Sequence, residues 1–145
     1  MEVIQGGIYM YEPPQQSASD QSALLTTSGS EQSGWRPWVI ISRDLLNRGN
    51  ARTAVGVPLS TNVGKANSYR ILLPAAELIA DVGSTYVFQN SVALCDHVRV
   101  LDLNQLRRKV GRVSANGLIS IVGVGLAFVT DIPFMNDSPH NKLIN

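Results

Sequence analysis

One arginine of this chain, Arg36, stands between a glycine and a proline just before a run of apolar residues. Pro37 disfavours the helical region for the residue that precedes it, so Arg36 is pushed into an extended conformation. Gly34 permits a tight turn in the approach, and the run 38–41 predicts a buried strand. The sequence therefore predicts a guanidinium fixed at the mouth of a strand, where its planar fork of donors suits a phosphate group.

Three short segments place polar and charged side chains at the ends of predicted strands. They are Glu31-Gln32-Ser-Gly-Trp35-Arg36-Pro, Val57-Pro-Leu-Ser60-Thr61-Asn62 and Leu94-Cys-Asp96-His97-Val-Arg99. In a small barrel such strand ends can converge, which would bring a guanidinium, a hydroxyl and an imidazole to one surface. An imidazole is the side chain best suited to moving a proton near neutral pH, and His97 would supply it here.

Each of these residues also has a structural interpretation. Arg36 could form a surface ion pair, and Ser60 and Thr61 could be ordinary turn residues. His97 could be half-exposed on an alternating strand, with Asp96 holding a neighbouring group. An indole can stack on a nucleobase, but Trp35 could equally belong to the core.

The sequence offers little for other kinds of chemistry. Cys95 is the only cysteine, which excludes an internal disulfide and fits a reducing compartment. With two histidines and one cysteine, no cluster has zinc spacing. A phosphate-binding glycine loop and a dinucleotide fingerprint are also absent. We therefore expect neither a metal nor a cofactor.

The composition limits the classes of protein to which this chain can belong. The 145 residues, 44% of them hydrophobic, predict one domain with a real core. A net charge of +1 gives no general attraction to nucleic acid, so such a role would depend on local basic groups. The longest apolar stretch, 118–129, is too short to span a bilayer, and the N-terminus does not resemble a signal peptide. We expect a cytoplasmic protein without a membrane segment.

The elements expected from the pattern are mostly strands. Strands are predicted over 8–11, 38–41, 54–59, 69–73, 91–95 and 98–101, and helical segments over 43–48, 74–80, 103–109 and from 114 or 116 to 130. Ser42 is expected to cap the first helix, with Leu45 and Leu46 turned inward. These elements predict a mostly β fold: a small, strongly curved antiparallel barrel with short helices and a C-terminal helix.

The expected domain is 1–131. Within it, segment 15–34 is rich in Ser, Gln, Thr and Gly and predicts a long mobile loop. Segment 132–145 has no periodic apolar pattern and predicts a disordered tail. The last helix is apolar nearly all round, which favours burial on more than one side, against the sheet and a partner subunit.

The motifs resemble a known family when they are taken in order. The order is Gly7-Ile-Tyr, then Gly-Ser-Glu-Gln-x-Gly-x-Arg-Pro-x-Val-Ile-Ile-Ser, then Val-Pro-Leu-Ser, then Ser-Val-x-Leu-x-Asp-x-Val-Arg-x-Leu-Asp, then Lys109-Val-Gly-Arg112. This pattern, over roughly 6–130, resembles the MazF/PemK toxins of type II toxin–antitoxin pairs, or mRNA interferases. The Glu-Gln-x-Gly-x-Arg-Pro block is the most specific part.

The resemblance implies a function. It implies an SH3-like barrel, a homodimer, a cognate antitoxin protein as partner, and sequence-specific cleavage of single-stranded RNA or mRNA without metal, through attack by the 2′-OH. The catalytic arginine of the family falls on Arg36, and its catalytic hydroxyl, usually a threonine, falls on Ser60. We expect substrate contacts from Glu31, Gln32, Trp35, Thr61, Asn62, Asp96 and His97. Some members carry a second catalytic arginine where this chain has Leu94.

Two other classes remain open. One is a non-catalytic toxin on the same barrel that inhibits gyrase, against which the Arg-Pro block argues. The other is a family member that has become an RNA- or protein-binding module.

Overall fold

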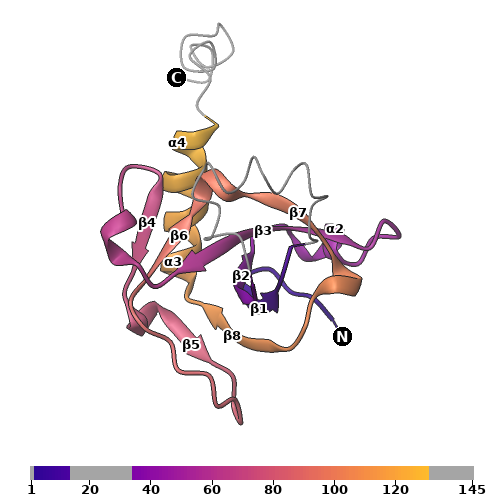
Figure 1. The fold of residues 1–145 in the computed structure, drawn as a ribbon. Helices are drawn as coiled ribbons and strands as arrows, with labels where there is room; N and C mark the ends of the chain where they lie inside the picture. Colours follow the sequence, from indigo (N-terminus) through magenta and orange to yellow (C-terminus); the bar gives the residue numbers. More distant parts are fainter. Residues whose placement is uncertain (1, 14–33, 131–145) are drawn as a thin grey trace, which may run out of the picture.

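The computed structural model describes residues 2–13 and 34–130, and within these ranges the chain forms one curled antiparallel sheet followed by a helix (Figure 1). The strands are β1 (Gly7–Tyr11), β2 (Arg36–Ile40), β3 (Thr53–Ser60), β4 (Arg70–Leu73), β5 (Leu78–Ala80), β6 (Ser91–Leu94), β7 (Arg99–Asp102) and β8 (Lys109–Val113). Their order is β4-β6-β3-β2-β1-β8-β5, and β7 also pairs with β3. The predicted mostly β, SH3-like antiparallel barrel with a C-terminal helix is confirmed, in the form of a half-barrel.

Short helical turns connect the strands. They are α2 (Asp44–Asn47) and the 3₁₀ turns η2 (Val63–Lys65), η3 (Ala75–Glu77), η4 (Cys95–His97) and η5 (Leu103–Gln105). The C-terminal helix runs through α3 (Ala115–Ser120), a π-helical segment η6 (Ile121–Leu126) and α4 (Ala127–Val129). None of the helices within 2–13 and 34–130 has the length and apolar character needed to cross a membrane.

Strand β3 organises the sheet. One of its edges pairs with β2, and the other pairs first with β7 and then with β6. The turn η4 separates β6 from β7, which lets the sheet bend sharply along β3. Side chains alternate between two cores. Val39 and Val57 belong to the larger one, and Trp38 and Ile40 to the smaller. Strand β2 is therefore buried on both faces, which explains its uninterrupted apolar sequence.

Helix α2 differs from the expectation. Its N-cap is Arg43, not Ser42, and Leu45 and Leu46 are 71% and 47% exposed. The buried side chain is Asn47, whose Nδ2 donates to the Ser42 carbonyl at 3.0 Å. The hydroxyl of Ser42 donates to Asn47 Oδ1 and accepts from the Val55 backbone amide at 2.9 Å. The polar pair thus ties α2 to β3, and this contact turns the leucines outward.

The predicted helix 74–80 is wrong after its first turn. The chain forms η3 and then strand β5, in which Leu78 pairs with Val113 of β8. The predicted helix 103–109 is also wrong beyond one turn. Asp102 caps η5 by accepting from the Asn104 amide at 2.9 Å, and the chain then becomes extended and enters β8. In both places pairing with a distant strand overrides the local helical preference.

The predicted C-terminal helix is present, and the hydroxyl of Ser114 caps it by accepting from the Gly117 amide at 2.9 Å. Its buried stripe consists of Gly117, Ile121 and Gly125, spaced four residues apart. Leu118 and Leu126 are partly buried beside this stripe, whereas Ile119, Val122, Val124, Phe128 and Val129 are exposed, so the single chain buries the helix on one side. The predicted mobile loop 15–34, apart from Gly34, and the predicted tail 132–145 lie outside the described residues.

Candidate active site

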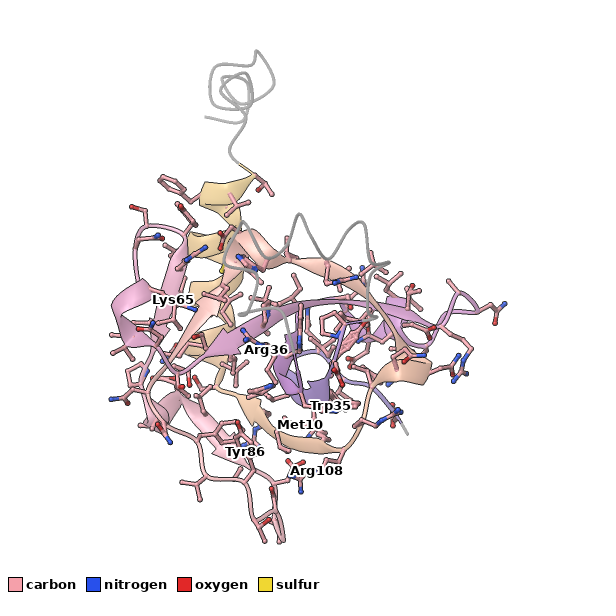
Figure 2. The ribbon with its side chains drawn as sticks, in the orientation of Figure 1. Met10, Trp35, Arg36, Lys65, Tyr86 and Arg108 are labelled. Carbon is pink, nitrogen blue, oxygen red and sulfur yellow. The ribbon has the colours of Figure 1, made fainter. Side chains whose placement is uncertain are left out.

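Arg36 is the first residue of β2, which begins two residues before the predicted strand 38–41. Gly34 has a φ of 78°, a left-handed conformation that favours glycine and turns the chain into the strand. Arg36 lies opposite Tyr11 of β1, and its Nε and Nη1 atoms are buried. The strand pairing and the following proline hold the guanidinium at the end of the sheet, near the centre of the view in Figure 2.

Ser60 is the last residue of β3 and reaches the same end of the sheet. Trp38 pairs with Pro58, so two further steps along the antiparallel strands bring Arg36 level with Ser60. Both residues line one pocket of about 270 Å³. Among the residues that the structure describes, the lining is Arg36, Pro37, Leu59, Ser60, Thr61, Tyr86, Val87, Phe88, Gln89 and Ser91. The structure thus brings together Arg36, Ser60 and Thr61 among the predicted site residues.

The side chains of Ser60 and Asn62 also shape the turn that follows β3. Ser60 Oγ accepts from the Asn62 amide at 3.2 Å, and Asn62 Oδ1 accepts from the Gly64 amide at 3.2 Å to cap η2. Accepting a hydrogen bond does not use the proton of Ser60, so the hydroxyl can still donate into the pocket. The side chain of Asn62 is engaged in the turn, and Asn62 does not line the pocket.

Sequence reasoning missed the opposite wall of the pocket. Tyr86 and Phe88 form it, with their ring centroids 4.9 Å apart. Burial raises the pKa of Tyr86, and Arg108 opposes that rise only in part, so the phenol stays protonated at neutral pH. Phe88 lies over Gly111 of β8, where a Cβ would come within 2.7 Å of the ring. An aromatic pair at positions i and i+2 was the available signal.

Asp96 and His97 lie on η4, outside the residues that line the pocket. Asp96 comes four residues after Val92, the β6 partner of Ser60. Arg70 on β4 binds Asp96 through two hydrogen bonds of 3.0 and 2.8 Å, and His97 Nε2 is 3.6 Å from the same carboxylate. Burial would raise the pKa of Asp96, but Arg70 and His97 outweigh it, and the net pKa is lowered.

The Arg70–Asp96–His97 cluster joins β4 to η4, the turn after β6. This contact stabilises the fold. The expected convergence of an imidazole with Arg36 and Ser60 is not seen in the pocket. A contact between this cluster and substrate stays a prediction.

The remaining predicted residues are distributed as follows. Trp35 is 48% exposed and lies beside the pocket, with the guanidinium carbon of Arg107 5.2 Å from its ring centroid. Glu31 and Gln32 lie outside the described residues. Across residues 2–13 and 34–130, no three His, Cys, Asp or Glu side chains are grouped so that they could hold a metal ion.

The chain is similar in sequence to a known protein family and to one of its characterised relatives. Residues 5–122 match the family model described as PemK-like, MazF-like toxin of type II toxin–antitoxin system. The chain is 30% identical over 105 residues to Endoribonuclease MazF9 of Mycobacterium tuberculosis, covering 70% of this chain and 83% of that protein. The residues matched by the family model contain both β2 and β3, which carry Arg36 and Ser60.

Solved structures share the fold. MazF from Deinococcus radiodurans has a TM-score of 0.63 and 22% identity, and the match covers 91% of this chain and 99% of that one. An endoribonuclease in complex with its cognate antitoxin, from a mycobacterial species, has a TM-score of 0.59 and 18% identity, covering 90% and 97%. At these identities the similarity shows that the fold is shared, namely the half-barrel with its C-terminal helix.

Proposed function

This chain belongs to the PemK-like, MazF-like toxin family of type II toxin–antitoxin systems, and on that premise we propose that it is an endoribonuclease that cuts single-stranded RNA, in particular mRNA, in the cytoplasm. The observation that carries the proposal is the meeting of Arg36 and Ser60 in one pocket at the end of the sheet. A guanidinium and a hydroxyl at one place form a suitable set of donors for a phosphodiester.

The reaction needs little beyond these donors, because RNA carries its own nucleophile. The 2′-oxygen loses its proton and forms a bond to phosphorus, the bond from phosphorus to the 5′-oxygen breaks, and that oxygen takes up a proton. The products are a 2′,3′-cyclic phosphate and a 5′-OH. Arg36 stabilises the negative charge that grows on the phosphate oxygens, and Ser60 donates a hydrogen bond to the same group. The protonated phenol of Tyr86 adds a neutral donor to the wall.

We propose that the reaction uses no metal ion. The described residues that line the pocket include no Asp, Glu, His or Cys, so the donors there suit an anion and not a divalent cation. Charge stabilisation then falls to Arg36.

The experiment is incubation of the purified protein with a long RNA in EDTA, with mapping of the new ends. We expect cuts at defined sequences with cyclic phosphate and 5′-OH ends. Loss of cleavage in EDTA that a divalent ion restores, or 5′-phosphate products, would contradict metal-independent attack by the 2′-OH. A folded protein that cuts no RNA under any condition would favour a gyrase inhibitor or a binding module.

We also propose two protein partners. The first is a second copy of this chain, since the C-terminal helix exposes apolar side chains that one chain leaves uncovered. The second is a cognate antitoxin, for which the mycobacterial complex is a structural precedent. An acidic antitoxin segment laid across the pocket would compete with RNA for Arg36 and so inhibit cleavage. A neighbouring reading frame for a small acidic protein, and its co-purification with this chain, would test the second partner.

A further inference from the structure

A second hollow, of about 370 Å³, lies next to the pocket that holds Arg36. Its lining, which we call the Trp35 surface, consists of Met10, Trp35, Arg107 and Arg108. Met10 is directly opposite Pro37, and Pro37 lines the Arg36 pocket. Met10 of β1 lines one hollow and Pro37 of β2 lines the other, so the two hollows lie on strands that pair with each other.

The charge of Arg108 also acts on the wall of the Arg36 pocket, because it opposes the rise in the pKa of the Tyr86 phenol that burial causes. Figure 2 shows Trp35, Met10 and Arg108 grouped on one side of Arg36, with Tyr86 nearby. An extended strand of RNA that crosses the Arg36 pocket would therefore continue onto the Trp35 surface.

The Trp35 surface is held in place by backbone pairing. The Arg107 amide donates to the Met10 carbonyl at 2.8 Å, and the Met10 amide donates to the Arg108 carbonyl at 3.1 Å. These bonds extend the β1–β8 ladder past its irregularity and fix where the two arginines stand. The guanidinium of Arg107 then lies 5.2 Å from the Trp35 ring centroid, within cation–π range. The result is an oriented indole beside two cations, with 48% of Trp35 still exposed.

We propose that the Trp35 surface binds one nucleotide of single-stranded RNA next to the cleaved bond, with its base stacked on Trp35 and its phosphate against Arg108. The inference rests on the proposed function and names a subsite of the same site. A flat π face accepts any base, and a neighbouring cation neutralises the phosphate that accompanies it. This pairing of a flat apolar face with positive charge matches the alternation of base and phosphate along the RNA.

The two tryptophans of the chain make the test direct. Trp38 is fully buried, so the fluorescence change on stacking reports on Trp35. The probe is a single-stranded oligonucleotide of mixed sequence with 2′-O-methyl riboses, which lacks the nucleophilic hydroxyl and cannot be cut. We expect it to quench the exposed tryptophan on binding.

Variants then separate stacking from charge. Trp35→Ala should raise the Kd for this oligonucleotide roughly 10-fold, and Trp35→Phe, which keeps an aromatic face, should stay within roughly threefold of the parent. Arg108→Ala should reduce the slope of log Kd against log salt by about 0.7, the value for one phosphate contact in a single strand. Leu45→Ala and Arg48→Ala are matched controls, because both residues are exposed on or just after α2.

Binding and cleavage can fail separately in this design. If the parent protein cuts no RNA but the oligonucleotide still quenches Trp35, the proposed function falls and the subsite stands. If cleavage is normal but Trp35→Ala changes neither fluorescence quenching nor affinity, the subsite is overturned and the nuclease stands. Loss of antitoxin binding in Trp35→Ala with unchanged RNA affinity would also overturn it, since the surface would then serve a protein.

Discussion

At the scale of the residue, Arg36 owes its position to its neighbours in sequence and to the strands beside it. Pro37 and Gly34 set the local backbone, and pairing with β1 and β3 places the side chain in the pocket with Ser60. A donor held in this way is oriented before substrate arrives, which is the condition under which it stabilises transition-state charge most strongly.

Replacing Arg36 with alanine should therefore reduce the single-turnover cleavage rate by at least about 10²-fold. Lysine should restore little of it, because an ammonium cannot reproduce the planar fork. Ser60→Ala should cost less, since a neutral hydrogen bond is weaker than a charged one. The rates should be measured on RNA in EDTA, with circular dichroism as the control for folding. Near-normal cleavage by folded Arg36→Ala would end this assignment.

The Asp96 carboxylate should stabilise the fold in a pH-dependent way. Its pKa in the folded protein is lowered, so its contribution is complete above its unfolded pKa of about 3.9 and is lost as the pH falls through the folded value. Asp96→Asn should cost about 1 kcal/mol at pH 7, and the difference from the parent should shrink at acid pH. Denaturant unfolding at a series of pH values measures this. A penalty that stays constant down to about pH 2 would contradict it.

At the scale of the element, the C-terminal helix depends on close contact with the sheet. Gly125 sits where a Cβ would come within 2.4 Å of Cys95 Sγ and 2.8 Å of Ile71. That approach lets the buried stripe of the helix lie directly on β4 and η4. It also explains the high pKa of Cys95, which burial raises to about 12, so this thiol is packing material and not a nucleophile.

Two glycines of the same helix should respond to alanine in opposite ways. Gly125→Ala should destabilise the protein by about 1–3 kcal/mol, because the methyl group has no room. A Cβ at Gly123 would meet only a side-chain carbon of Ile119, at 3.9 Å, so Gly123→Ala should stabilise the helix by up to about 1 kcal/mol. Thermal unfolding of both variants checks this. Equal shifts in the same direction would show that the helix is not held against the sheet as described.

At the scale of the whole molecule, the exposed apolar side of the C-terminal helix favours association with a partner chain. Ile119, Val124 and Phe128 are 65%, 54% and 56% exposed, and Phe128 stacks on Tyr69 with centroids 5.7 Å apart. These side chains leave an apolar area exposed along one side of the helix.

A charge placed in this area should break the proposed homodimer. Ile119→Lys and Val124→Glu should each shift the protein to monomer in sedimentation at micromolar concentration, because an interface core excludes unpaired charge. Val82→Lys is the control, since Val82 is fully exposed on the loop after β5. A parent protein that sediments as a monomer would remove the prediction altogether.

The sequence by itself predicted the backbone around Arg36 and the strand that follows it, because these signals are local. The glycine and the proline around Arg36 act on the backbone next to them, and the apolar run after them predicts β2 without knowledge of any partner. The antiparallel class and the C-terminal helix follow from the same kind of short-range pattern, whereas the choice of Ser114 as the cap of that helix came from the structure.

The tertiary structure decided what depends on distant pairing. Strands β5 and β8 have weak strand signals of their own and exist because they pair with each other and, for β8, with β1. Tyr86 lines the pocket from a segment without regular structure. Arg70 lies 26 residues before Asp96 and binds its carboxylate in a separate cluster. Local conformational preferences amount to fractions of a kcal/mol per residue, and the pairing and packing of a whole strand exceed them. For that reason the local motifs predicted that Arg36 precedes a strand and that Ser60 ends one, while the residues around them in the pocket were fixed only by the pairing of the whole sheet.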